Sequence, residues 1–180
     1  MNAAIRPLID LAHAAFFGQA SWQMFIDRVV EVAGADCATL FFHDAPSGRG
    51  AITLSSGVPD TALRDYADHF GALNPWMWQV GQTPICEAVV GEQLVPRDRM
   101  RSTEYYNDFL QAYGQETGVG VTIERASGRF LMLSTLSGDL DEERNLNRAR
   151  VLTEGRQAAQ AGNWSIVIRR VRMEGPSLKG

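Results

Sequence analysis

The sequence has few of the residues on which metal sites and disulfide scaffolds depend. Cys37 and Cys86 are the only two cysteines among 180 residues, and they form no Cys-x-x-Cys pair or Cys/His cluster. Isolated cysteines of this kind are typical of buried, reduced thiols. We therefore expect no metal site and no cofactor, and the cysteine content favours a reducing compartment.

Long hydrophobic runs are also missing. No stretch approaches the ~20 apolar residues that a membrane-spanning helix needs, and Arg6, Asp10 and His13 interrupt the apolar N-terminal segment in a way that excludes a signal peptide. The net charge of −4 and the pI of about 5.4 match neither a phosphate backbone nor an anionic membrane as a partner. We expect a soluble, cytoplasmic protein without membrane contact.

A catalytic constellation is the third absence. His13, His43 and His69 stand outside the HExxH and G-x-S-x-G contexts in which such residues act. The acidic residues of 139–143 are explained by capping a helix and by favourable interaction with its dipole, rather than by metal binding. The sequence therefore predicts a protein that is not an enzyme.

The residues that are present suffice for one folded core. Hydrophobic residues make up 45% of the chain, which is ample for a single domain of this length. We assign residues 1–174 to that domain and residues 175–180 to a linker or tail. Helical periodicity predicts helices that begin near Ile5, Ser21, Pro59 and Asp139, and a helix over 103–113. Alternating apolar residues predict strands over 37–43, 51–56, 88–95, 118–125 and 129–136.

These elements predict one antiparallel sheet. Two hairpins and one middle strand supply its five strands, and helices must cover its faces. In the second strand, Ile52 and Leu54 are expected on the same side because alternate residues share a face. Gly155 is expected to weaken the last helix, since glycine is a poor helix former.

Residues 103–110 are the most informative stretch of the chain. They read Thr-Glu-Tyr-Tyr-Asn-Asp-Phe-Leu, and the pairs Tyr105/Phe109 and Tyr106/Leu110 are each four residues apart. Side chains at this spacing meet on one helical face. A helix that buries several aromatic rings, two of them with hydroxyls, either seals a core or lines a pocket. Composition alone does not decide between these alternatives.

Three motifs in this order resemble the N-terminal sensor domains of LuxR-type helix-turn-helix transcription regulators. They are Asn74-Pro75-Trp76, the segment Gly91-Glu-Gln-Leu-Val-Pro-Arg97, and residues 103–110 followed by Gly114. The last motif resembles the branch of that family whose sensors carry a "YNDFL" helix. The resemblance implies an α+β fold of the PAS/GAF-like kind, an α-β-α sandwich with a central five-stranded antiparallel sheet.

The same resemblance implies a ligand pocket. Tyr66, Phe70 and Asn74-Pro75 look like the family's pocket motif, but Phe70 has no hydroxyl and Asn74 replaces the aspartate that accepts an amide proton from an acyl-homoserine lactone. Without charge assistance that bond is roughly half as strong. We therefore expect a different small molecule, or none. The candidate ligand-binding residues are Tyr66, Phe70, Asn74, Trp76, Tyr105, Tyr106 and Phe109.

Two functions follow from the resemblance. The first is a small-molecule-sensing regulatory domain of a LuxR-type regulator, which would reach DNA only through a DNA-binding domain absent from this chain. The alternative is a ligandless module of the same fold that dimerises or modulates a full-length regulator. A stripe at Trp164, Ile168 and Val171 predicts a homodimer seam, unless it packs on its own sheet.

Overall fold

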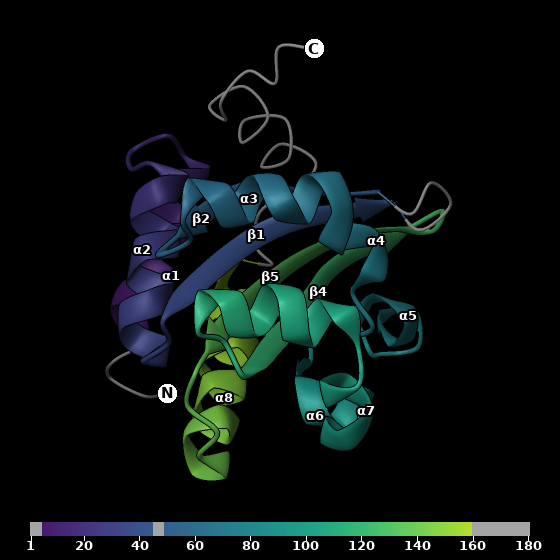
Figure 1. Cartoon of the computed structure of the whole chain (residues 1–180). Coiled ribbons are helices and arrows are strands. Elements are labelled where there is room, and N and C mark those ends of the chain that lie inside the picture. The colour runs from purple at the N-terminus through teal and green to yellow at the C-terminus, as the bar shows by residue number, and fades with distance from the viewer. Residues whose placement is uncertain (1–4, 45–48, 160–180) are drawn as a thin grey trace.

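A five-stranded antiparallel sheet lies between two helical layers in the computed structural model, which describes residues 5–44 and 49–159 (Figure 1). The strand order is β2-β1-β5-β4-β3. The strands are β1 (Cys37–Asp44), β2 (Arg49–Ser56), β3 (Ala88–Val90), β4 (Thr117–Ala126) and β5 (Arg129–Ser137). The mixed α+β sandwich expected from the sequence is therefore confirmed. The candidate dimer stripe and the tail at 175–180 lie outside the described residues.

One face of the sheet is covered by α1 (Arg6–Phe16), α2 (Trp22–Ala33) and α8 (Glu142–Ala159). The ends of α2 follow local chemistry, because the Ser21 hydroxyl accepts the Met24 N–H at 3.2 Å and Gly34 adopts a left-handed conformation. The long helix α8 continues through Gly155, so the weakening expected of this glycine does not end the helix there. A Cβ atom at this position would lie 2.8 Å from Leu8 Cδ2, so glycine permits α8 to pack closely on α1.

The opposite face carries shorter helical segments. They are α3 (Asp60–Asp65), η1 (Tyr66–Phe70), α4 (Gly71–Leu73), α5 (Met77–Val80), η2 (Tyr105–Leu110) and η3 (Gln111–Tyr113), with α6 (Gly91–Leu94) and α7 (Arg97–Arg101) beside them. Figure 1 shows α3 and the teal helix formed by η2 and η3 in front of the sheet. Both η1 and η2 are π-helical, and η3 is a 3₁₀ turn. None of the described helices combines the length and apolarity that crossing a membrane requires.

A β-bulge overturns the prediction that Ile52 and Leu54 share a face. In the β1–β2 register Leu40 pairs with Leu54 and Phe41 pairs with Ile52, so Thr53 has no partner of its own. The extra residue reverses the alternation. Leu54 consequently packs against the core under α1 and α2, and Ile52 packs against the core of the opposite layer.

Strand β3 is shorter than the predicted strand at 88–95. It ends at Val90, where the backbone N–H donates to Gln93 Oε1 at 2.9 Å, and α6 begins at Gly91. The turn brings Gly91 under the indole of Trp76, since a Cβ on Gly91 would lie 2.7 Å from Trp76 Nε1. The motif around Gly91 is thus a strand end and a helical turn, and its glycine accommodates a tryptophan.

Candidate functional site

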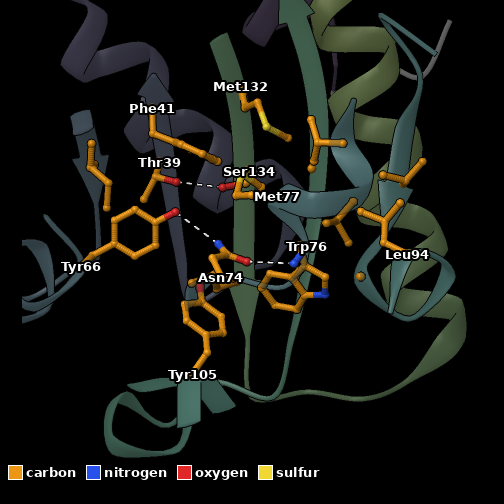
Figure 2. A pocket seen from close by; sticks show the side chains of 18 of the residues that line it. Thr39, Phe41, Tyr66, Asn74, Trp76, Met77, Leu94, Tyr105, Met132 and Ser134 are labelled. Carbon is orange, nitrogen blue, oxygen red and sulfur yellow. Dashed lines mark hydrogen bonds between the residues drawn. The ribbon is translucent and has the colours of Figure 1, made fainter. Parts of the chain in front are cut away.

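A cavity of about 80 Å³ lies between the sheet and the layer that contains η1 and η2 (Figure 2). One water molecule needs roughly 10–15 Å³ of such space, so the cavity holds several waters or a small organic group. Its wall is mostly apolar, and none of the twenty residues that line it carries a formal charge at neutral pH. An apolar hollow with a few polar groups is the usual form of a small-molecule site.

Glycines form part of the cavity wall, because a residue without a side chain leaves space between the sheet and the helical layer. Strand β4 contributes Gly118 and Gly120, and α6 contributes Gly91. A Cβ on Gly118 would lie 3.2 Å from the Trp76 ring, so Trp76 is seated over Gly91 and Gly118 together. A Cβ on Gly120 would meet its nearest neighbour, Met132 Cε, only at 3.6 Å. The wall at Gly120 is therefore open to the cavity.

Asn74 organises the polar part of the wall. Its Oδ1 accepts the backbone N–H of Trp76 at 3.1 Å, and its Nδ2 donates to the Tyr66 hydroxyl at 3.2 Å. A bond from an Asn oxygen to a backbone N–H two residues later is an Asx turn, which suits the Asn-Pro-Trp sequence. Because a backbone N–H only donates, this bond determines which amide atom is the oxygen. Figure 2 shows Asn74 between the rings of Tyr66 and Trp76.

Two buried tyrosines reach the cavity from the π-helical segments. Burial raises the pKa of Tyr66 to about 12, and the bond from Asn74 opposes this shift only in part. Burial also raises the pKa of Tyr105 well above its ordinary value, with smaller contributions from Tyr66 and Cys37. Both phenols are therefore neutral at physiological pH. Among the described residues, the Tyr105 hydroxyl has no hydrogen-bond partner, although the side chain is only 2% exposed.

The strands supply two more hydroxyls. Thr39 Oγ1 and Ser134 Oγ lie 2.8 Å apart across the β1–β5 pair, and both residues line the cavity. Either oxygen serves as the donor of this bond. The cavity wall therefore has two polar clusters. The Thr39–Ser134 hydroxyl pair lies on the sheet side, and Asn74 with Tyr66 lies on the helical side.

Five of the seven predicted ligand-binding residues line this cavity. They are Tyr66, Asn74, Trp76, Tyr105 and Phe109. Segments far apart in the sequence bring them together, and ring contacts connect them: Trp76 with Tyr105 at 5.9 Å, and Tyr105 with Phe109 at 5.3 Å between centroids. Their ligand-binding role stays a prediction, which the shared cavity supports.

The structure places Phe70 and Tyr106 outside the cavity wall. Tyr106 follows Tyr105 directly, so its ring points to another side of the helix, where its hydroxyl donates to Glu116 Oε2 at 2.7 Å. Phe70 packs against Phe109, with 5.0 Å between ring centroids, and of the two only Phe109 lines the cavity. Both rings support the residues that line the cavity rather than contribute to its surface.

Sequence reasoning missed the contributions of Thr39, Ser134, Gly118 and Gly120. The glycines did carry a signal, because glycine inside a strand often marks a place where another group approaches closely. The hydroxyl pair carried none, since its two members belong to strands 95 positions apart in the sequence.

A second depression is larger, about 280 Å³, but it is a weaker candidate. It lies beside Trp78, which is 68% exposed, and has His43 and Phe130 in its wall. It lacks the converging amide and hydroxyl groups of the first cavity. Within the described part of the chain, no cluster of His, Cys, Asp and Glu is arranged to hold a metal ion.

Comparisons with solved structures identify similar folds. The ligand-binding domain of VqsR from Pseudomonas aeruginosa matches with a TM-score of 0.59 and 19% identity, covering 87% of this chain and 95% of that chain. CepR2 from Burkholderia cenocepacia, described as an N-acylhomoserine lactone dependent LuxR family transcription factor, matches with a TM-score of 0.65 and 12% identity. The match covers 92% of this chain and 99% of that chain.

A GAF domain is also similar. The domain from a phosphoenolpyruvate-protein phosphotransferase of Coxiella burnetii matches with a TM-score of 0.50 and 12% identity, covering 96% of this chain and 99% of that chain. No family model matches the sequence, and no curated protein matches it. At these identities the likeness establishes the fold, which is that of LuxR-type ligand-binding domains and GAF domains.

Proposed function

We propose that this chain is a cytoplasmic small-molecule-sensing domain of a LuxR-type transcription regulator, and that its ligand occupies the cavity beside Asn74. One observation carries the proposal: an uncharged cavity, lined by buried tyrosines and an amide, lies between the sheet and a helical layer. The resemblance of the "YNDFL" segment and the folds of VqsR and CepR2 support it. In this proposal DNA is contacted by a domain outside these 180 residues.

The cavity is well placed to transmit binding. Residues of β4 alternate between the two faces of the sheet, with Gly118 and Gly120 in the cavity wall and Val121 and Ile123 in the core under α8. A ligand that binds only the folded chain, at a hundred times its dissociation constant, adds about 2.7 kcal/mol to stability. Binding would therefore favour one arrangement of the helical layer and, through the sheet, of α8.

The test has two parts. Native mass spectrometry of the protein purified from its host is expected to show an added small mass. Thermal unfolding with the compound so identified is expected to show a rise in Tm of several degrees. The matched control is Gly120→Val, which places its side chain in the cavity from a position where a Cβ is accommodated.

Gly120→Val is expected to remain folded and to lose the ligand-dependent rise in Tm. The proposal is wrong if the variant responds to the ligand as the original chain does, because the ligand then binds elsewhere.

The homodimer stays a prediction, since Trp164 and Ile168 lie outside the described residues. Sedimentation of the full chain over a range of concentrations tests it.

A further inference from the structure

We infer that the cavity selects a neutral ligand that accepts hydrogen bonds and has no N–H or O–H group to donate. The inference rests on the proposed function, because it specifies the ligand class of the same cavity. It follows from counting the hydrogen atoms and lone pairs that the wall leaves without partners.

Asn74 and Tyr66 each have one polar hydrogen that is not used in a hydrogen bond within the described chain. The Asn74 oxygen already accepts the Trp76 N–H, and one of the two Nδ2 hydrogens goes to the Tyr66 oxygen. The second Nδ2 hydrogen and the hydroxyl hydrogen of Tyr66 then have no acceptor among the described side chains. Both groups lie in the cavity wall, and both residues are nine-tenths or more buried.

Tyr105 and the strand hydroxyls add two further donors. The Tyr105 hydroxyl has no hydrogen-bond partner in the described chain, and its residue is 2% exposed. Thr39 and Ser134 bond to each other, so one of their two hydrogens serves that bond and the other is left over. Four groups in the cavity wall thus each keep one hydrogen that has no acceptor among the described residues.

The wall offers little to a ligand that donates or carries charge. It contains no carboxylate, imidazole, ammonium or guanidinium group. A hydroxyl group of the wall that accepts a hydrogen bond from a ligand still needs an acceptor for its own hydrogen. Carbonyl or ether oxygens on the ligand accept these hydrogens, whereas a ligand N–H adds one more donor to a site that already has more donors than acceptors. A buried donor without an acceptor lowers affinity by about 5- to 150-fold.

Two isomeric amides test the inference. N,N-dimethylacetamide and N-ethylacetamide have the same formula and one carbonyl each, but only the second has an N–H. Each is titrated into the full chain, with butanoate as a charged probe of similar size. The readout is the NMR signal of ¹³C-labelled methionine methyl groups. Met77 and Met132 line the cavity, and the exposed Met24 is the internal control.

The expected result is a shift of the Met77 and Met132 signals with N,N-dimethylacetamide, at least fivefold weaker binding of N-ethylacetamide, and no shift with butanoate. Equal or tighter binding of N-ethylacetamide overturns the donor-surplus inference and leaves the binding cavity intact. If no probe shifts Met77 or Met132, both the proposed binding function and this inference fail.

Asn74→Asp supplies a second, independent comparison. The carboxylate keeps an oxygen for the Trp76 N–H, but it removes the Nδ2 donor and adds a charged acceptor beside the cavity. We expect the preference between the two isomers to reverse in favour of N-ethylacetamide. An unchanged preference would mean that Asn74 does not set the hydrogen-bonding character of the site.

Discussion

At the scale of single residues, three glycines shape this cavity. Trp76 is 8% exposed and lies over Gly91 and Gly118, so its indole takes the volume that two side chains would otherwise fill. Gly120, one step further along the same face of β4, has no ring above it and leaves that volume empty. Neighbouring glycines therefore have different tasks: two of them accommodate a tryptophan, and the third keeps space open.

Substituting these glycines by alanine separates the two tasks. A Cβ on Gly91 would lie 2.7 to 2.9 Å from three Trp76 ring atoms, and a ring cannot bend away as a flexible chain can. Gly91→Ala is expected to lower the free energy of unfolding by about 1–3 kcal/mol through overpacking. Urea denaturation followed by circular dichroism measures this loss.

Gly120→Ala is the matched control, because its Cβ makes only ordinary contacts from 3.6 Å outward. It is expected to leave stability unchanged or to raise it by up to about 1 kcal/mol, since alanine loses less backbone entropy than glycine on folding. Equal losses in the two variants would refute the assignment of separate tasks.

The helical elements over the cavity have an unusual form. Both η1 and η2 are π-helical, and each places one tyrosine in the cavity wall, Tyr66 from η1 and Tyr105 from η2. Contacts across their seam join them, since the His69 and Glu104 side chains approach to 2.5 Å and the Tyr113 hydroxyl donates to Asp65 at 2.6 Å. Wide helical turns of this kind are frequent at functional sites.

High pH is expected to loosen this helical layer. The folded pKa of Tyr66 is about 12 against an ordinary value of 10.0, so between these values the unfolded chain loses the phenolic proton and the folded chain keeps it. Stability is therefore undiminished below pH 10 and falls as the pH rises toward 12, by on the order of 2–3 kcal/mol for this group. Tyr105, whose pKa is also raised, acts in the same direction. Urea unfolding at pH 8, 10 and 11 measures the decline.

Tyr66→Phe removes one titrating group and is expected to flatten that decline. Tyr113→Phe is the comparison, because the pKa of Tyr113 is raised first by its bond to Asp65 rather than by burial. A decline as steep in Tyr66→Phe as in the original chain would show that burial of Tyr66 is not its cause.

The sequence predicted the elements whose ends depend on local chemistry. The helix α2 begins at Ser21 as expected and ends at Gly34, and the β4–β5 hairpin turns at Ser127 and Gly128, both with positive φ, as a type I′ turn requires. The π-helical form of η2 was not predicted. Tyr105 and Phe109 meet in either kind of helix, so their spacing does not distinguish a π-helix from an α-helix.

Tertiary contacts decided the remaining parts of the site. The bulge at Thr53 turns Ile52 toward the cavity, and nothing in the alternation of β2 announces the extra residue. Strand β3 ends directly before Gly91, which lies under Trp76, a residue fifteen positions earlier in the sequence. Such features need the partner element in place, so a pattern read along one strand does not contain them.

At the scale of the whole molecule, two cores lie on opposite faces of the same strands. The cavity belongs to the face under η1 and η2, and α8 packs on the other face against α1, α2, β3 and β4. The N–H of Ala88 in β3 donates to Thr153 Oγ1 of α8 at 3.1 Å. Its neighbour Val89 lines the cavity. A change on the cavity side of β3 therefore lies one residue from a hydrogen bond to α8.

Arg148 is a buried charged group that joins α8 to the end of α2. It is 3% exposed, and its Nε and Nη2 both donate to the Gly34 carbonyl at the end of α2, at 3.3 and 2.8 Å. Its Nη1 donates to Asn145 Oδ1 at 2.7 Å, and Asp139 Oδ2 lies 3.5 Å from Nη2. A planar guanidinium makes these bonds together, whereas the single ammonium of lysine does not.

Arg148→Lys is consequently expected to lower the free energy of unfolding by about 2–4 kcal/mol, because the Gly34 carbonyl and the Asn145 oxygen lose buried donors. Hydrogen exchange is expected to locate the loss in α8 and at the end of α2, with the cavity side less affected. Arg144→Lys is the matched control, since the Arg144 side chain is 70% exposed and donates to Asp139 Oδ2 at 2.7 Å on the surface, and little change is expected there. Equal effects of the two substitutions, or faster exchange spread evenly over both faces of the sheet, would mean that Arg148 does not hold α8 against the end of α2.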